Sequence, residues 1–244
     1  MAFRDWGAVL TLIRYTAMHL RRVRHPVVST VLQRQIYFTG IEALPAVSFI
    51  ALLTGIVITT QTVSLIGNMP GVLGRVMLWV VVRELGPVLT AIVIIARSSS
   101  AAASELAAMK IRGEMNSLRL MGIDPMDALI IPRIVGVTLS VVAVTFYFQV
   151  TAILGGFAFT ALWHGTPMRQ DMEGLIQLLS LQEVIASFTK ALAFGLMISA
   201  TSCYFGLRAK GAMTAVPQAA TGAVMRNLMT LFLLDGLITY LFFV

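Results

Sequence analysis

The segment LPAVSFIALLTGIVITTQTVSLI, residues 44–66, decides the class of this fold. It contains no charged side chain, and no charge occurs anywhere between Glu42 and Arg75. A helix needs about 20 consecutive apolar residues to cross the hydrocarbon core of a bilayer. Residues 44–66 are therefore predicted to span a membrane.

The composition of the whole chain supports the same conclusion. Of its 244 residues, 58% are hydrophobic and 12% are charged, and the mean hydropathy is +0.87. Soluble domains contain roughly 45–50% apolar and about 25% charged residues, so a soluble enzyme and a disordered chain are both excluded. Cys203 is the only cysteine, which excludes a disulfide scaffold, and the three histidines lack the spacing of metal ligands. The chain is predicted to be an integral membrane protein without a metal or cofactor of its own.

Further apolar segments predict an all-α integral membrane protein with five transmembrane helices. The second segment contains Arg83, Glu84 and Arg97, and the last contains Asp235, so these two are less apolar than the first. Residues 44–244 are expected to form a single membrane domain. The predicted spans are residues 44–66, 76–104, 134–162, 184–207 and 227–244.

Residues 1–43 differ from the rest because they are rich in arginine. Apolar side chains such as Trp6, Val9 and Ile13 recur at helical spacing, and Arg14 lies off that stripe. This pattern predicts an amphipathic helix in the membrane interface, with arginines that reach lipid phosphates. The alternative is an ordinary solvated cytoplasmic helix. A signal peptide is not expected, because Arg14 interrupts the apolar stretch and no small-residue cleavage site follows.

The distribution of lysine and arginine predicts the orientation of the chain in the membrane. With the N-terminus in the cytoplasm, most basic residues outside the spans face the cytoplasm, and only Arg75, Arg169 and Lys190 are assigned to the other side. Five spans then place the C-terminus across the membrane. The basic residues are not interleaved with aromatic ones, so no nucleic-acid partner is expected.

The sequence Arg83-Glu84-Leu85-Gly86-Pro87 places two charges inside the second span. An arginine at the bilayer centre costs roughly 2.5–3.5 kcal/mol on insertion scales, and charged residues there are usually functional. Pro87 removes a backbone donor, and we expect Arg83 and Glu84 to line one polar cavity in which Arg83 binds a phosphate headgroup. The alternative is that each residue pairs across helices and stabilises the bundle. Asp235 has the same two interpretations.

Residues Glu105–Gly122 predict a short cytoplasmic helix between the second and third spans. Ile111, Met115 and Leu118 form an apolar face at helical spacing, Gly122 suits a C-terminal cap, and Asp124 suits the N-cap of the next helix. Such a helix fits a groove on a cytoplasmic partner. The alternative is a helix that rests on its own bundle.

Two negative observations limit the chemistry. The sequence has no G-x-x-x-x-G-K-[ST] loop, so ATP that drives transport must be hydrolysed by another subunit. The run Ser98–Ser104 consists of small residues suited to helix packing, and no G-x-S-x-G motif accompanies it. The chain is therefore not expected to be an enzyme.

Four motifs resemble the signature of the MlaE/YrbE permeases of MCE (mammalian cell entry) ABC lipid transporters. That signature runs L-R-E-L-G-P-V-x-x-A, A/G-R, A-E-x-x-x-M and L-x-x-M-G-x-x-P-x-x-x-x-x-x-P-R, and the similarity extends over almost the whole chain. The matching residues are Val82 to Ala91, Ala96-Arg97, Ser104-Glu105 with Met109, and Leu118, Met121, Gly122, Pro125, Pro132 and Arg133.

The resemblance implies a homodimer in a bacterial inner membrane, with an interfacial N-terminal helix and five spans per chain. It implies two cytoplasmic ATPase subunits, which bind the ATP and magnesium, and a periplasmic ring of MCE-domain proteins. The cargo is a phospholipid or similar hydrophobic molecule moved between the inner membrane and the outer envelope. Arg83 and Glu84 match residues of the lipid cavity. Structural or coupling roles are expected for Arg97, Glu105, Gly113, Glu114, Met115, Leu118, Gly122 and Asp235.

The sequence departs from the family pattern in two places. Arg112-Gly113-Glu114 replaces the usual Thr-Glu-Gln of the coupling helix. Gln218 and Gly222 stand where the family often has arginines before the last span. Arg226, one turn later, is expected to supply that charge and to bind substrate with Arg83 and Glu84.

Two other functions compete with a permease subunit. The first is a stand-alone ion- or proton-coupled carrier that uses Glu84 and Asp235, although no inverted repeat is evident. The second is a membrane enzyme that acts on lipid headgroups, which would need an acid–base or metal constellation that the sequence lacks.

Overall fold

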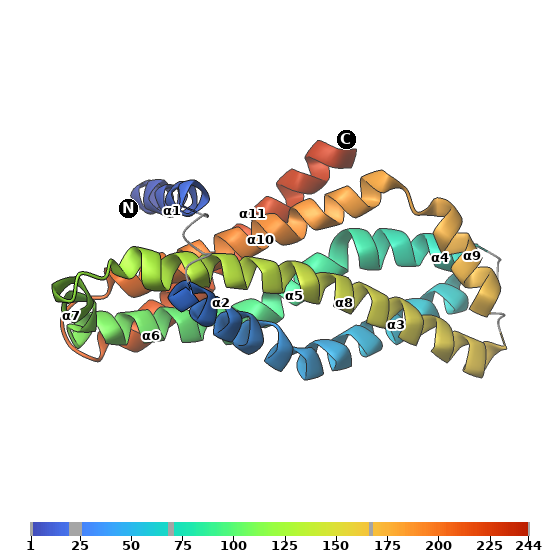
Figure 1. Ribbon diagram of the computed structural model, residues 1–244. Coiled ribbons are helices and arrows are strands. Elements are labelled where there is room, and N and C mark those ends of the chain that lie inside the picture. The colour runs from blue at the N-terminus through green and yellow to red at the C-terminus, as the bar shows by residue number, and fades with distance from the viewer. Residues whose placement is uncertain (1, 20–25, 68–70, 166–167, 244) are drawn as a thin grey trace.

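The computed structural model describes residues 2–19, 26–67, 71–165 and 168–243, and these residues form helices with no strand among them (Figure 1). The helices are α1 (Ala2–Met18), α2 (Pro26–Thr39), η2 (Ile41–Ala43), α3 (Leu44–Ile66), α4 (Val72–Met77), η3 (Leu78–Leu85), α5 (Gly86–Ile94), η4 (Ile95–Ser99), α6 (Ser100–Ile111), α7 (Glu114–Leu120), η5 (Met126–Ile130), α8 (Ile131–His164), α9 (Met168–Leu178), α10 (Leu181–Arg208) and α11 (Ala215–Phe243).

Five helical segments are long and apolar enough to cross a membrane, which confirms the predicted all-α class. They are Ser29–Ile66, Val72–Ile111, Met126–Trp163, Leu181–Arg208 and Ala215–Phe243. Figure 1 shows them side by side as an elongated bundle, with α7 at one end and α9 with α4 at the other. We call these the α7 end and the α9 end.

The first long helix begins before the predicted span, because α2 continues into α3 through the short turn η2. The separate helix α1 lies on the outside of the bundle, beside α10, and also contacts α8 (Figure 1). Val9 of α1 is buried against the bundle, whereas Leu10, Met18 and Arg14 are exposed. An exposed apolar side chain on a helix of this kind is suited to lipid contact. The interfacial position of α1 stays a prediction.

The second long helix is interrupted by π-helical turns, η3 and η4, on either side of α5. Pro87 lies in the first turn of α5 and has no N–H to donate to the carbonyl of Arg83. Gly86 is also required here, because a Cβ at this position would lie 2.6 Å from the carbonyl oxygen of Val81 and 2.8 Å from Cγ of Gln149. The absence of a side chain at Gly86 thus allows Gln149 of α8 to lie against the backbone just after η3 ends.

Small residues allow α3 and α8 to pack closely. A Cβ on Gly55 would lie 2.0 Å from the carbonyl oxygen of Ala152, and a Cβ on Gly156 would lie 2.9 Å from the carbonyl oxygen of Gly55. Membrane helices gain little from the hydrophobic effect between them, so close packing of this kind supplies much of their association.

The predicted cytoplasmic helix Glu105–Gly122 is wrong as a single helix. Residues up to Ile111 belong to α6, the chain then turns at Gly113 with φ +79°, and α7 is a separate helix. The apolar face expected across Ile111, Met115 and Leu118 is therefore divided between two helices. Gly122, with φ +77°, ends α7 as predicted, and the N–H of Ile123 donates to the carbonyl of Leu118 at 3.0 Å. A side-chain oxygen of Asp124 also accepts the N–H of Met126 at 3.0 Å, as predicted for a cap.

Candidate functional site

Arg83 and Glu84 lie together at the end of η3, inside the second long helix. Nε of Arg83 is 3.4 Å from Oε1 of Glu84, and both side chains are mostly buried. Neighbouring residues on a regular α-helix point in different directions, and the π-helical turn changes that spacing. The expectation that both side chains face one polar region agrees with this geometry, and their role in binding stays a prediction.

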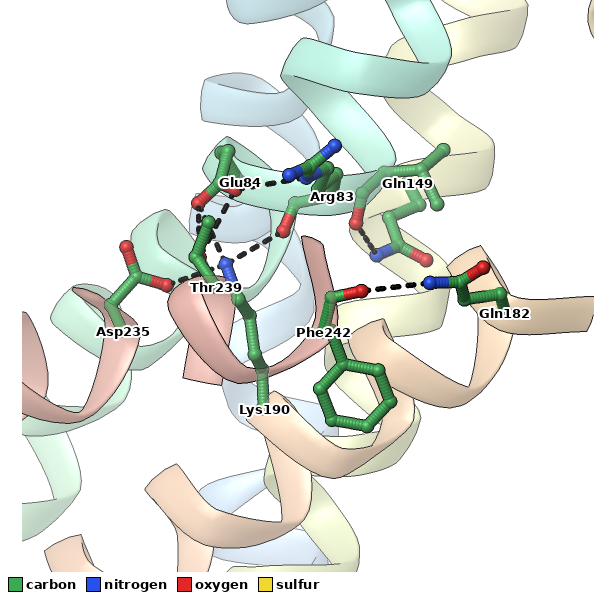
Figure 2. A network of polar contacts seen from close by, with 9 residues as sticks. Arg83, Glu84, Gln149, Gln182, Lys190, Asp235, Thr239 and Phe242 are labelled. Atoms are coloured by element: carbon green, nitrogen blue, oxygen red, sulfur yellow. Dashed lines mark hydrogen bonds and ion pairs between the residues drawn. The ribbon is translucent and has the colours of Figure 1, made fainter. Parts of the chain in front are cut away.

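Lys190 of α10 is the centre of this polar region, and its side chain is completely buried. Its ammonium lies 2.6 Å from Oε2 of Glu84 and 2.8 Å from Oδ1 of Asp235, so one cation joins two carboxylates from two other helices (Figure 2). Sequence analysis assigned Lys190 to the far side of the membrane. Lys190 nevertheless lies inside the predicted span 184–207, and the structure corrects the assignment by placing its side chain in the interior of the bundle, paired with Glu84 and Asp235.

A backbone oxygen completes the environment of Lys190. The ammonium donates to the carbonyl of Arg83 at 3.0 Å. This oxygen would accept an N–H from residue 87 in a regular helix, but residue 87 is a proline. The carbonyl thus receives a hydrogen bond from the buried lysine in place of the one that Pro87 cannot donate.

Thr239 connects the last helix to the same carboxylate. Its hydroxyl lies 3.2 and 3.3 Å from the two carboxylate oxygens of Glu84, and it follows Asp235 by one turn of α11. Glu84 is thus held by α10 and α11 together, as Figure 2 shows. We call Arg83, Glu84, Lys190, Asp235 and Thr239 the charged cluster.

Further polar side chains extend the charged cluster along α10. Glu183, Ser187 and Lys190 share one face of this helix, at intervals of four and three residues. Gln149 of α8 donates to the hydroxyl of Ser187 at 2.7 Å and to the carbonyl of Val82 at 3.0 Å. Glu183 is buried, and its Oε2 has no hydrogen-bond partner in the described part of the chain. Three carboxylates and two cations therefore lie in this region of the bundle.

The C-terminal turn of α11 covers Arg83. The guanidinium carbon lies 3.1 Å from the centre of the Phe243 ring, a cation–π contact. Gln182 of α10 donates to the carbonyl of Phe242 at 2.7 Å and fixes this turn (Figure 2). Access to Arg83 in this conformation depends on the position of Phe243.

Arg226 does not join Arg83 and Glu84. It precedes Asp235 by roughly 13 Å along α11, and its guanidinium lies 5.9 Å from the ring of Trp6 on α1. The next residue, Asn227, is buried and donates to the hydroxyl of Ser99 at 2.7 Å. The three residues expected to bind substrate are thus divided between two places.

Arg97 and Glu105 each form an ion pair outside the charged cluster. Arg97 donates to both the carboxylate and the backbone oxygen of Glu42, at the junction between α2 and α3. Glu105 pairs with the buried Arg133 at 2.5 Å. Both contacts join different helices, and the structural or coupling roles expected for these residues stay predictions.

The residues expected to couple to a partner differ in their accessibility. Met115 is buried in the bundle, and Glu114 lies 3.6 Å from Arg112. The most exposed apolar side chains of this segment are Leu120, 89% exposed, and Met121, 65% exposed. These two residues lie at the α7 end, where sequence analysis did not single them out for contact.

Sequence reasoning missed Lys190, Thr239, Gln149 and Glu183. A signal for Lys190 was present, since a lysine inside a predicted span raises the same question as Arg83. Threonine and glutamine carry no charge, so nothing in the sequence distinguishes them from residues that bond within their own helix.

Comparisons with known proteins place the chain among permeases. A family model described as Permease MlaE matches residues 32–241. A probable ABC transporter permease of Rickettsia typhi is 26% identical over 223 residues, which cover 91% of this chain and 86% of that protein. A probable ABC transporter permease of Synechocystis is 29% identical, over 70% of this chain and 65% of that protein. The Arabidopsis thaliana chloroplastic protein TRIGALACTOSYLDIACYLGLYCEROL 1 is 30% identical, over 66% of this chain and 46% of that protein.

Proposed function

The chain belongs to the MlaE family of permeases, and from this premise we propose that it is the membrane subunit of an ATP-driven transporter of phospholipids or similar lipids. The observation that carries the proposal is the charged cluster. Charged side chains inside a membrane are costly and mark pathways for polar groups. Here Arg83, Glu84, Lys190 and Asp235 come from three long helices and meet inside the bundle.

Arg83 is the residue best suited to bind a lipid phosphate. A guanidinium forms paired hydrogen bonds with phosphate, and Arg83 contacts its carboxylate partner only at 3.4 Å. Lys190 is occupied by two carboxylates and a carbonyl, so it holds Glu84 in place. A headgroup that displaces Phe243 would reach Arg83 without disturbing the lysine.

Two arguments support a lipid as the cargo: the suitability of Arg83 for binding phosphate, and the similarity to a named relative. The name of the Arabidopsis relative contains that of a diacylglycerol lipid, which concerns that protein and supports the same class of cargo here. The resemblance found in the sequence adds MCE-domain proteins and a second copy of this chain as partners. We propose that the assembly moves lipid between the bacterial inner membrane and the outer envelope.

A cytoplasmic ATPase is the partner that drives transport in this proposal. The relatives named as ABC transporter permeases support this, as does the lack of a nucleotide-binding loop in this chain. Leu120 and Met121 at the α7 end supply exposed apolar surface for the contact.

We place the α7 end in the cytoplasm, with the N-terminus, by the excess of basic residues near it. A reporter active only in the periplasm should then be active after Val244 and inactive in the turn at residue 211. Activity at residue 211 would reverse the proposed orientation.

Transport by the purified assembly tests the function. The complex with its ATPase is reconstituted into vesicles that contain a labelled phospholipid, and ATP-dependent transfer to an acceptor is measured. We expect Arg83→Ala to assemble and to lose transfer, and the exposed Arg169→Ala to behave as wild type. Normal transfer by Arg83→Ala would assign Arg83 a structural role only.

One observation favours the stand-alone carrier as a second candidate. Together with Glu183, the charged cluster contains three carboxylates and two cations. Binding of one proton would balance the additional negative charge. Such a carrier would respond to a pH gradient in vesicles that lack the ATPase. An ATP requirement with no response to a pH gradient would exclude it.

A further inference from the structure

A groove of about 1090 Å³ lies at the α7 end, separate from the charged cluster. It is bordered by α2, α6 and the beginning of α11, with the buried Arg133 of α8 and the exposed Arg34 of α2 in its lining. Arg83 and the groove residue Ala101 are roughly 27 Å apart along the second long helix. The groove is therefore a different site.

The groove extends from the end of the bundle toward the interior of the membrane. Arg112 and Ala101 both line it, and they are roughly 16 Å apart along α6 and the turn that follows. Its other lining residues include apolar side chains, among them Val31, Phe38 and Val216. Glu42, which pairs with Arg97, also lines the groove, so charged side chains occur along its length beside the apolar ones. A groove with charged and apolar walls fits an amphipathic molecule.

The charges in the groove are of both signs, and one cation is unpaired. Arg133 pairs with Glu105, and Arg112 pairs with Glu114. Arg34 has no ion-pair or hydrogen-bond partner in the part of the chain that the structure describes. The side chain of Glu105 is 60% exposed although it pairs with Arg133, so its carboxylate has room for a second donor.

We propose that this groove binds the headgroup of a zwitterionic phospholipid from the adjacent leaflet. The phosphate contacts Arg34, the ammonium contacts Glu105, and the acyl chains lie along Phe38, which follows Arg34 by about one helical turn in the direction of α3. An apolar helix from a second copy of this chain fits less well, because it would bury Arg34 without a partner, and an unpaired buried charge is strongly destabilising. This site goes beyond the proposed transport site and does not depend on it.

Photo-crosslinking from inside the groove tests the proposal. Tyr37 lines the groove and is 55% exposed, so a photoreactive benzoylphenylalanine fits there with little change in size. The protein is placed in vesicles of equal amounts of phosphatidylethanolamine and phosphatidylglycerol, irradiated, and its lipid adducts are identified by mass spectrometry. The same group at Tyr147, an exposed position that is not part of the groove, samples the bulk lipid.

The groove adduct should contain more phosphatidylethanolamine than the adduct at Tyr147. Arg34→Ala should lower the groove adduct roughly tenfold, the effect of one lost charge-assisted hydrogen bond, and Arg34→Lys should restore part of it. Arg119→Ala, an exposed arginine on α7 outside the groove, is the matched control and should change nothing. Because Arg34 is exposed, its replacement should leave the fold intact.

Three results would overturn the proposal. The first is an adduct at Tyr37 with the bulk lipid composition that does not respond to Arg34→Ala. The second is a crosslink to another protein chain in place of lipid, which would make the groove a protein interface. The third is complete displacement of the adduct by excess inorganic phosphate, which would make it a simple anion site. None of these results depends on whether Arg83 is needed for transport.

Discussion

The ammonium of Lys190 lies 3.0 Å from the carbonyl oxygen of Arg83, the oxygen to which residue 87 would donate in a regular helix if it were not a proline. A proline in the second long helix therefore creates part of the binding environment for a lysine in the fourth. Lys190 then holds Glu84 and Asp235, and the three helices are joined at one buried point.

Replacing Lys190 should destabilise the protein strongly. Lys190→Met takes the cation away from two partly buried carboxylates, and Glu84 then keeps only Arg83 at 3.4 Å. Removal of one partner from a fully buried ion pair costs about 3–5 kcal/mol, which is an upper limit for this site. We expect a clear fall in the midpoint of thermal unfolding, measured in detergent.

Neutral partners should restore part of that stability. Lys190→Met combined with Glu84→Gln and Asp235→Asn neutralises both carboxylates that contact the lysine, so its unfolding midpoint should lie above that of Lys190→Met. It should stay below that of the wild type, because Arg83 loses its carboxylate partner. A triple variant as unstable as Lys190→Met would mean that the lysine stabilises the bundle by packing and not by its charge.

Removing the ring of Phe243 should make Arg83 accessible. Phe243→Ala takes away the ring that lies 3.1 Å from the guanidinium, and phenylglyoxal, a reagent for arginine, should then modify Arg83 faster. Peptide mass spectrometry after timed labelling gives the rate. Tyr240→Ala is the control, because Tyr240 is an exposed aromatic residue on the same helix. Equal labelling of Arg83 in both variants would exclude Phe243 as its cover.

Two substitutions near α7 should separate contact with a partner from stability of the fold. Leu120→Asp changes an exposed side chain and should weaken binding of the ATPase while the unfolding midpoint stays the same. Met115→Asp buries an unpaired charge and should lower the unfolding midpoint. Pull-down and thermal unfolding of both variants provide the comparison. Unchanged capture of the ATPase by Leu120→Asp would remove this surface from the proposed contact.

Gly55 should tolerate no side chain. Gly55→Ala places a Cβ 2.0 Å from the carbonyl oxygen of Ala152, so α3 and α8 must separate, at a cost of about 1–3 kcal/mol. Gly236→Ala is the matched control, since a Cβ there meets nothing within 4 Å and φ is not in the left-handed region. Thermal unfolding should show a large fall for the first variant and little change for the second. Similar midpoints would contradict close packing at Gly55.

Some of the candidate site was predictable because charge is conspicuous in an apolar segment. Arg83, Glu84 and Asp235 were identified on that ground alone. Lys190 was counted with the basic residues of the far side although it lies inside the predicted span 184–207, because the sequence does not show that two carboxylates from other helices pair with it there. Arg226 was grouped with Arg83 because of the family resemblance. Asp235 belongs to the same cluster as Arg83, and α11 holds Arg226 roughly 13 Å from Asp235, so Arg226 lies outside that cluster.

The amino-acid sequence by itself determined that this chain is a helical membrane protein with five long apolar segments. This follows from the local balance between apolar length and charge, which needs no knowledge of which helices touch. Only the tertiary structure decided which charges meet, that Phe243 covers Arg83, and that Met115 is buried while Leu120 is exposed. The physical reason is that membrane helices are apolar on nearly every side. Their sequence does not mark the face that packs inward, and close contacts between small residues far apart in the chain select it.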